Sequence, residues 1–214
     1  MVQITKEQII GENRLSRQDK INLFEGLLLS TNRAGMDKVL DFIKRSDFYT
    51  APASSNHHSS YEGGLLDHVL LVYSLAMDYA NTMKAVDPNL ALVLKDENII
   101  ISSLLHDFCK LYIYKPTQKW KKDEYNQWVA YNGYNIEDMF PVGHGEKSII
   151  MLQGIGLDLE PCEMIAIRHH MGFWGGETNR EATATQLRGM KMCPLVILLQ
   201  MADFSSSLIF EIDP

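Results

Sequence analysis

The feature that most constrains this fold is an aspartate in the most apolar stretch of the chain. Residues 194–210 are mostly apolar, yet Asp203 stands among leucines, an alanine and a phenylalanine. A carboxylate buried in such a helix costs several kcal/mol unless it is paired or binds a metal. No lysine or arginine lies within one helical turn of it. A partner must therefore come from elsewhere, and a divalent cation held by histidines would serve; the alternative is that Asp203 faces solvent beside Ser206 and Ser207.

Composition sets the class of protein in which this aspartate lies. The chain has 214 residues, of which 46% are hydrophobic and 22% charged, with a net charge of −7. These values are typical of one folded domain and exclude disorder as the main state. The acidic balance disfavours a broad nucleic-acid surface. The sequence has no apolar stretch long enough to span a membrane and no signal-peptide pattern. Its three cysteines are scattered, and we expect them to be reduced. We therefore predict a cytoplasmic protein without a membrane partner.

Most of the chain has helical periodicity. Between residues 36 and 43, apolar side chains recur at the spacing of one helix face. Further helices are expected over residues 19–30, 65–79, 98–106, 145–153, 161–172 and 194–210. Residues 49–64 have the composition of a loop, and residues 111–135 alternate aromatic with polar residues, which favours a small β-hairpin-like excursion. We predict an all-α bundle, with an N-terminal helical segment (1–48) packed on or extending a domain at 49–214.

Histidines lie at unusual places on these predicted helices. Taken singly, each has a common explanation: a histidine on an apolar face is often hydrogen-bonded in the core, and one at a helix C-terminus is favoured by the helix dipole. Their recurrence on consecutive helices, together with Asp203, favours a shared site. The residues concerned are His68, His106 with Asp107, His144, and His169 with His170.

Five short segments carry a resemblance to a known family. They are GGLLDH (63–68), SLLHDFCK (103–110), VGHGEKS (142–148), IRHHMG (167–172) and ADFS (202–205). In this order they resemble the HD superfamily of metal-dependent phosphohydrolases, over roughly residues 49–210, which implies an HD-domain helical bundle. The loop NHHSSYEGGLLDH is also similar to the HD domain of YhaM-type 3′–5′ exoribonucleases, although their OB domain is not evident in residues 1–48.

The resemblance implies a set of metal ligands. A first ion would be held by His68, His106, Asp107 and Asp203, and Asp107 would bridge to a second ion completed by His144 and one or both of His169 and His170. We therefore expect a binuclear site. Imidazole and carboxylate donors suit Mn²⁺, Fe²⁺, Zn²⁺, Co²⁺ or Ni²⁺ better than Mg²⁺. Such a site provides a metal-activated hydroxide that attacks a phosphate.

Other polar residues are candidates for catalysis and substrate binding. Besides Asp107, the expected catalytic residues are Lys110, which matches a family lysine and could contact a phosphate, and His58, which could donate a proton to the leaving oxygen. Arg168 and His57 are expected to bind substrate. The alternatives are a solvated face for Arg168 and an ordinary polar loop for both histidines. The excursion at 111–135 is either an ordinary exposed hairpin or a lid that selects the substrate.

The sequence thus predicts a metal-dependent phosphohydrolase. Its substrate would be a phosphomonoester or phosphodiester of a nucleotide or a short oligonucleotide, so short single-stranded RNA or DNA is an open partner, as is a second copy of the chain. The first alternative is a di-iron oxygenase of the HD type, because such enzymes use a similar ligand set. The second is a non-catalytic HD module that binds a nucleotide.

Overall fold

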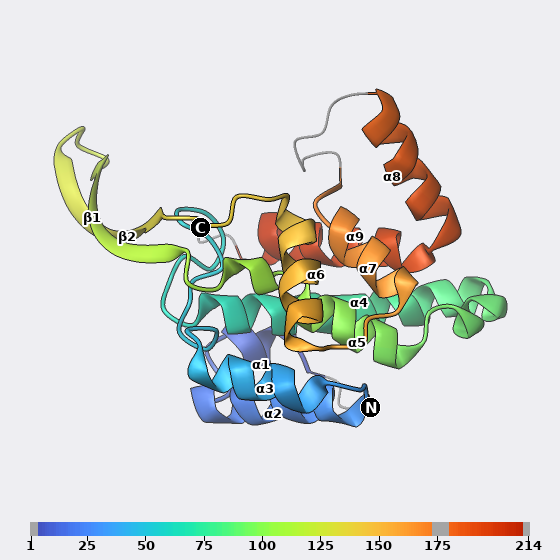
Figure 1. Ribbon diagram of the computed structural model, residues 1–214. Helices are drawn as coiled ribbons and strands as arrows, with labels where there is room; N and C mark the ends of the chain where they lie inside the picture. The colour runs from blue at the N-terminus through green and yellow to red at the C-terminus, as the bar shows by residue number, and fades with distance from the viewer. Residues whose placement is uncertain (1–3, 173–179, 212–214) are drawn as a thin grey trace.

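The computed structural model, which describes residues 4–172 and 180–211, is an all-α bundle with one β-hairpin, as predicted (Figure 1). Short turns of 3₁₀ helix follow α4 and α5, at η1 (Pro88–Leu92) and η2 (Phe108–Lys110), and a π-helical turn, η4 (Ser206–Phe210), follows α9. The strands are β1 (Tyr114–Lys122) and β2 (Trp128–Ile136). The helices are α1 (Lys6–Ile10), α2 (Arg17–Ser30), α3 (Met36–Arg45), α4 (Gly64–Val86), α5 (Asp96–Leu105), α6 (His144–Ile155), α7 (Pro161–His169), α8 (Arg180–Met192) and α9 (Pro194–Ser205).

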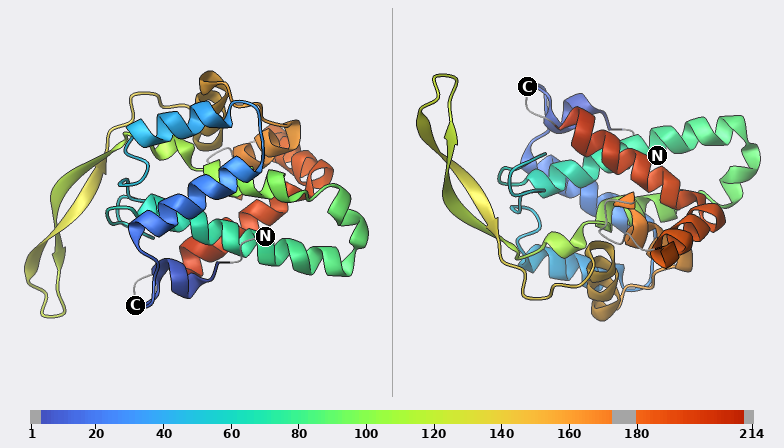
Figure 2. Two further views of the ribbon diagram at one scale, coloured as in Figure 1. Left: turned by 90° about the horizontal axis from the view of Figure 1, so that it is seen from below. Right: turned by 90° about the horizontal axis from the view of Figure 1, so that it is seen from above.

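Helix α4 lies at the centre of the bundle. Helices α2 and α3 lie on one side of α4 and α5, and α6, α7 and α9 lie on the other (Figure 1). Both further views show α4 running through the body of the molecule (Figure 2). Residues Gly64–Ser74 of α4 are buried on every side. Because the apolar groups of this segment are enclosed by several helices, its polar residues must find partners within the protein.

The predicted helices are present, and their ends follow from local chemistry. The apolar stripe of α3 is buried, and Pro161 and Pro194 stand in the first turns of α7 and α9, where proline is tolerated. Helix α4 continues beyond the predicted end at residue 79 until Pro88, which disfavours helix in the residue before it. Helix α8 was not predicted. Its apolar side chains are largely exposed and form no clear stripe, so periodicity gave no signal for it.

Both faces of the hairpin β1–β2 combine aromatic residues with lysine. The antiparallel register places Trp120, Trp128 and Lys122 on one face, together with Tyr114 and Tyr134, and places Lys115, Lys119, Lys121 and Tyr131 on the other. Both tryptophans are more than half exposed. The hairpin projects away from the helical body (Figures 1 and 2). The hairpin predicted at 111–135 is therefore present. A lid would have to lie over the helices that carry the predicted ligands, so the position of the hairpin does not support the lid interpretation.

A buried ion pair joins the N-terminal segment to the central helix. Lys20 Nζ on α2 lies 2.6 Å from Asp67 Oδ1 on α4, and both side chains are less than a tenth exposed. The Tyr61 hydroxyl donates to the other carboxylate oxygen at 3.0 Å. Residues of α2 and α3 also belong to the same apolar core as α4 and α5. The segment 1–48 therefore contributes to the core, whereas its predicted separation from a domain at 49–214 stays a prediction.

The cysteines differ from expectation. Cys162, at the start of α7, and Cys193, directly before α9, form a disulfide, whereas the sequence led us to expect reduced thiols. Packing of α7 against α9 brings together two residues that are 31 positions apart, which spacing along the chain cannot show. Cys109 is free and buried. Disulfides are uncommon in cytosolic proteins, and the cytoplasmic location stays a prediction.

Membrane-spanning potential is weak in the described part of the chain. No single helix there is long and apolar enough to cross a bilayer. The pair formed by α8 and residues 194–210 passes a test of length and composition, but it is bent by 104°, and α9 contributes buried side chains to the core.

Replacing Lys20 by Met should lower the free energy of unfolding by about 3–5 kcal/mol, because it leaves the Asp67 carboxylate buried without its cation. Urea unfolding of the metal-free protein measures this. The double variant Lys20→Met/Asp67→Leu is the control and should recover most of the loss, since no buried charge remains. A loss below about 1 kcal/mol in the single variant, the usual value of an exposed pair, would contradict the prediction.

Candidate metal centre

Five helices bring the predicted ligands together. His68 lies in the second turn of α4, and Asp203 lies in the last turn of α9. His106 and Asp107 occupy the junction between α5 and η2, His144 is the first residue of α6, and His170 directly follows α7. His68, His106 and His170 are fully buried, and Asp203 is only 5% exposed, so the solvent-facing alternative for Asp203 is wrong.

The buried histidines point their Nε2 atoms at the two aspartates. His68 Nε2 lies 3.3 Å from Asp107 Oδ2 and 3.4 Å from Asp203 Oδ1. His106 Nε2 lies 3.3 Å from the same Asp107 oxygen. The Nε2 atoms of His68, His106 and His170 are buried and have no hydrogen-bond partner. Buried nitrogens left in this state are costly unless something else binds them, and a metal ion fits.

The opposite nitrogen of each ring is held by an acceptor. The Nδ1 of His106 lies 2.8 Å from the carbonyl of Ser103, and that of His170 lies 2.7 Å from the carbonyl of Ile167. His68 Nδ1 lies 2.8 Å from Glu211 Oε1. A proton on Nδ1 leaves the lone pair on Nε2 directed inward, which is how metal-ligating histidines are commonly oriented. All three rings are therefore arranged as ligands.

Asp107 presents its two oxygens to different partners. Oδ2 faces His68 and His106, while Oδ1 lies 2.8 Å from His144 Nε2 and 3.7 Å from His170 Nε2. Lys110 Nζ lies 2.6 Å from Oδ2 and is 9% exposed. Within the described ranges 4–172 and 180–211, four groups of side chains have potential ligand atoms within 4.8 Å of one another. Three of them contain Asp107 or Asp203, and the fourth joins His68 to its neighbours outside the cluster. The groups are His68, His106 and Asp107; His106, His170 and Asp203; Asp107, His144 and His170; and His58, His68 and Glu211.

The charges of the cluster favour cation binding. Burial alone would raise the pKa of the Asp107 carboxyl, but Lys110 and His106 hold it well below its usual range. Burial would likewise raise the pKa of Asp203, but the nearby His68 and the charge of His106 keep it low. Burial and then the nearby His106 lower the pKa of His170 to about 3. At neutral pH the cluster thus contains two ionised carboxylates and an unprotonated His170. Against the effect of burial, Glu211 raises the pKa of His68, and Cys109 raises the pKa of His144 to about 10, so a cation that bound these two rings would displace their protons.

The paired histidines 169 and 170 have separate environments. His170 belongs to the cluster, whereas no group of potential ligands among the described residues includes His169. His169 Nε2 lies 3.1 Å from Arg168 Nη1, and its ring lies beside Gly189 of α8. The sequence left open which of the two would be the ligand, and the geometry favours His170.

The predicted substrate-binding and catalytic residues are placed unevenly. Arg168 Nε lies 2.9 Å from Glu146 Oε1 on α6, near His144 in sequence, and His57 is exposed in the loop before α4. The His58 ring lies 4.9 Å from the His68 ring, and its Nε2 is buried without a partner. Burial, His68 and Lys110 lower the pKa of His58 to about 4. Because the imidazole is therefore neutral at pH 7, this pKa disfavours the proton-donating role, which stays a prediction.

Two supporting residues were not assigned from the sequence. Glu211 binds His68, and burial would raise its pKa, but His68 and two serines lower it to about 2. Ser148, inside the segment VGHGEKS, donates to the His106 carbonyl at 2.6 Å and accepts from the Cys109 amide at 3.0 Å. The place of Ser148 within a segment that carries the family resemblance was a weak signal for it, whereas nothing local marked Glu211.

Comparison with known proteins agrees with this geometry. Residues 65–206, about two thirds of the chain, match the HD domain family. The chain belongs to the HD domain family. A curated relative, the dihydroneopterin 2′,3′-cyclic phosphate phosphodiesterase of Methanocaldococcus jannaschii, is 29% identical over 119 residues, which cover 56% of this chain and 42% of the relative. No solved structure matches the chain. The superfamily prediction is confirmed, while the closer likeness to YhaM-type enzymes stays a prediction.

Because Ser148 fixes the backbone of the HD doublet, Ser148→Ala should lower the free energy of unfolding of the metal-free protein by about 1–3 kcal/mol. The loss arises because the buried His106 carbonyl and Cys109 amide lose their partner. Ser102→Ala is a matched control: the Ser102 hydroxyl is equally buried but has no partner, so its removal should be neutral or stabilising. Equal losses in the two variants, measured by urea unfolding, would contradict this role of Ser148.

Proposed function

We propose that this HD domain is a metal-dependent phosphohydrolase that cleaves a phosphodiester of a nucleotide or a related small molecule. The observation that carries the proposal is the cluster of three buried histidines whose unpartnered Nε2 atoms face Asp107 and Asp203. The donors are imidazoles and carboxylates, which suit Mn²⁺, Fe²⁺, Zn²⁺, Co²⁺ or Ni²⁺. When bound, such ions would supply an activated water and stabilise negative charge on the phosphoryl oxygens.

The division of Asp107 contacts supports two ions rather than one. His68, His106 and Asp203 would hold the first ion together with Asp107 Oδ2, and His144 and His170 would hold the second with Asp107 Oδ1. A carboxylate that presents one oxygen to each group is suited to bridge a binuclear site. The role of bridging ligand therefore falls to Asp107 in this proposal.

The remaining polar residues would bind and orient the phosphate. His144 is the most exposed of the proposed ligands, with 34% of its side chain accessible, so substrate would approach beside it. Lys110 keeps its ammonium against Asp107 and would place positive charge close to a bound phosphate. Arg168, held by Glu146, would add charge near the opening. Neutral His58 would serve as a hydrogen-bonding group beside His68.

A small phosphodiester is favoured over a long oligonucleotide. The relative from Methanocaldococcus jannaschii is named for a cyclic phosphodiester of a heterocyclic compound. A few residues before His144 in the sequence, the exposed side chains of Met139 and Phe140 offer apolar surface on which a heterocycle could lie. We therefore propose a 2′,3′-cyclic nucleotide or a similar cyclic ester as substrate.

The direct test is phosphate-ester cleavage by the metal-free protein before and after addition of Mn²⁺ or Co²⁺. We expect metal-dependent cleavage of bis(p-nitrophenyl) phosphate and of 2′,3′-cyclic nucleotides, and slower cleavage of p-nitrophenyl phosphate. Asp107→Ala should lose both the bound metal and the activity, because it removes the shared ligand. Asp67→Asn, which alters a buried aspartate paired with Lys20, should keep its metal. Full metal occupancy in Asp107→Ala, or no turnover of any ester by the loaded protein, would contradict the proposal.

The stoichiometry tests the binuclear arrangement separately. His144→Ala should lower the metal content from about two ions per chain to about one, because His144 contributes only to the second group. His169→Ala is the control, since it removes a neighbouring histidine that lies outside the cluster, and it should leave the content unchanged. Elemental analysis after dialysis measures both. An unchanged content in His144→Ala would reduce the proposal to a site for one ion.

A further inference from the structure

Among the three buried histidines, His68 is anchored in a different way. His106 and His170 come directly after the last residue of α5 and α7, where the carbonyl three residues earlier is free to accept a hydrogen bond from Nδ1. His68 lies near the start of α4, and the carbonyls before it accept bonds from the helix itself. Its Nδ1 therefore needs an acceptor from another part of the chain, and Glu211 supplies it at 2.8 Å.

Glu211 is fixed within a small buried network. The accessible fraction of its carboxylate side chain is zero. Oε1 accepts from His68 Nδ1 and from the Ser206 hydroxyl, while Oε2 accepts from the Ser59 hydroxyl at 2.5 Å. Ser59 belongs to the loop before α4, and Ser206 begins η4. With three donors from three segments, the carboxylate has little freedom to rotate.

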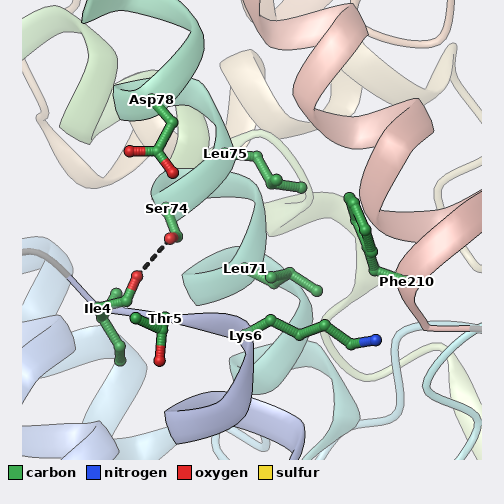
Figure 3. A pocket seen from close by; sticks show the side chains of 8 residues that line it. All are labelled: Ile4, Thr5, Lys6, Leu71, Ser74, Leu75, Asp78 and Phe210. Atoms are coloured by element: carbon green, nitrogen blue, oxygen red, sulfur yellow. Dashed lines mark hydrogen bonds between the residues drawn. The ribbon is translucent and has the colours of Figure 1, made fainter.

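The π-helical turn η4 delivers this carboxylate. The Glu211 amide donates to the Ser206 carbonyl at 3.0 Å, which brings the two side chains to the same side of the turn. On the other side, Phe210 faces α4 across a cavity of about 170 Å³ and lies beside Lys6 of α1 (Figure 3). Lys6 Nζ is 5.4 Å from the centre of the Phe210 ring. The turn is thus seated against α4 and α1.

We propose that Glu211 is a positioning residue for the metal centre. Its carboxylate holds the His68 proton on Nδ1 and fixes the ring plane, so that the Nε2 lone pair points at the position shared with Asp107 and Asp203. Ser59 and Ser206 set the orientation of the carboxylate. Glu211 and Ser59 lie outside the span 65–206 that matches the family. The inference rests on the metal centre of the proposed function, although it does not depend on which ester is cleaved.

The test compares metal affinity in Glu211→Ala, Glu211→Gln and the wild-type chain, by competition for Co²⁺ with a chelating dye. Glu211→Ala should weaken the affinity by about 10–100-fold, because His68 loses its orienting partner. Glu211→Gln keeps an oxygen acceptor for Nδ1 and should recover part of that loss. The visible absorption of bound Co²⁺ should change in Glu211→Ala, since the geometry of one ligand changes.

Glu163→Gln is the matched control. Glu163, in the first turn of α7, is also fully buried, but it pairs with Arg33 from the loop after α2 and does not contact the cluster. This variant should unfold more readily in the metal-free form while it keeps the Co²⁺ affinity and spectrum of the wild type.

The outcomes separate this inference from the proposed function. Wild-type affinity and spectrum in a folded Glu211→Ala protein would overturn the positioning role and leave the proposed function standing. Equal loss of affinity in Glu163→Gln would also overturn it, since general destabilisation would then be the cause. If the wild-type chain binds no Co²⁺, both this inference and the metal centre fail. A positioning role that holds in a protein without phosphohydrolase activity would overturn the proposed function alone.

Discussion

The structure depends on the burial of two carboxylates in an apolar bundle. Asp107 and Asp203 are at most 5% exposed, and the free energy of placing such charges in the interior is unfavourable unless they are compensated. Lys110 compensates part of the charge of Asp107, and three buried histidines direct nitrogen lone pairs at the same space. A cluster of two carboxylates and several imidazole nitrogens, with a single lysine beside it, is a chemical environment that binds divalent cations. The apolar core therefore surrounds a polar centre whose buried charges must be compensated.

The precision of that centre comes from helix ends rather than from helix interiors. His106 and Asp107 lie where α5 gives way to η2, His170 follows α7, and His144 opens α6. At the C-terminal ends of α5 and α7 the backbone has unpaired carbonyls, which hold the His106 and His170 rings through Nδ1. The apolar faces of the same helices pack into the core and so hold each helix end in place. In this way packing far from the cluster determines which way the ligands point.

Sequence analysis predicted the bundle and most of the cluster because both depend on patterns that a chain records locally. Apolar periodicity marked α3 and a long apolar run marked α9, and Asp203 was conspicuous because it interrupts that run. The sequence could not decide between His169 and His170. Adjacent helix positions face different directions, and apolar residues occur on both faces of α7, so the pattern did not show which histidine faces the core. The disulfide between Cys162 and Cys193 and the contact of Glu211 with His68 depend on tertiary packing, so no spacing rule could reveal them.

Segments outside the family match contribute side chains that orient His68 and are not themselves among the proposed metal ligands. The loop before α4 contributes Ser59, the turn after α9 contributes Glu211, and α1 supports that turn through Lys6 and Phe210. A carboxylate bound to one ring nitrogen increases the electron-donating strength of the other, so an anionic partner makes His68 a stronger ligand than a backbone carbonyl would. His106 and His170, anchored by carbonyls, lack this effect. The asymmetry places the imidazole with an anionic partner on the Oδ2 side of Asp107, opposite the more exposed His144. In the proposed binuclear arrangement, the first ion would then be held more tightly than the second.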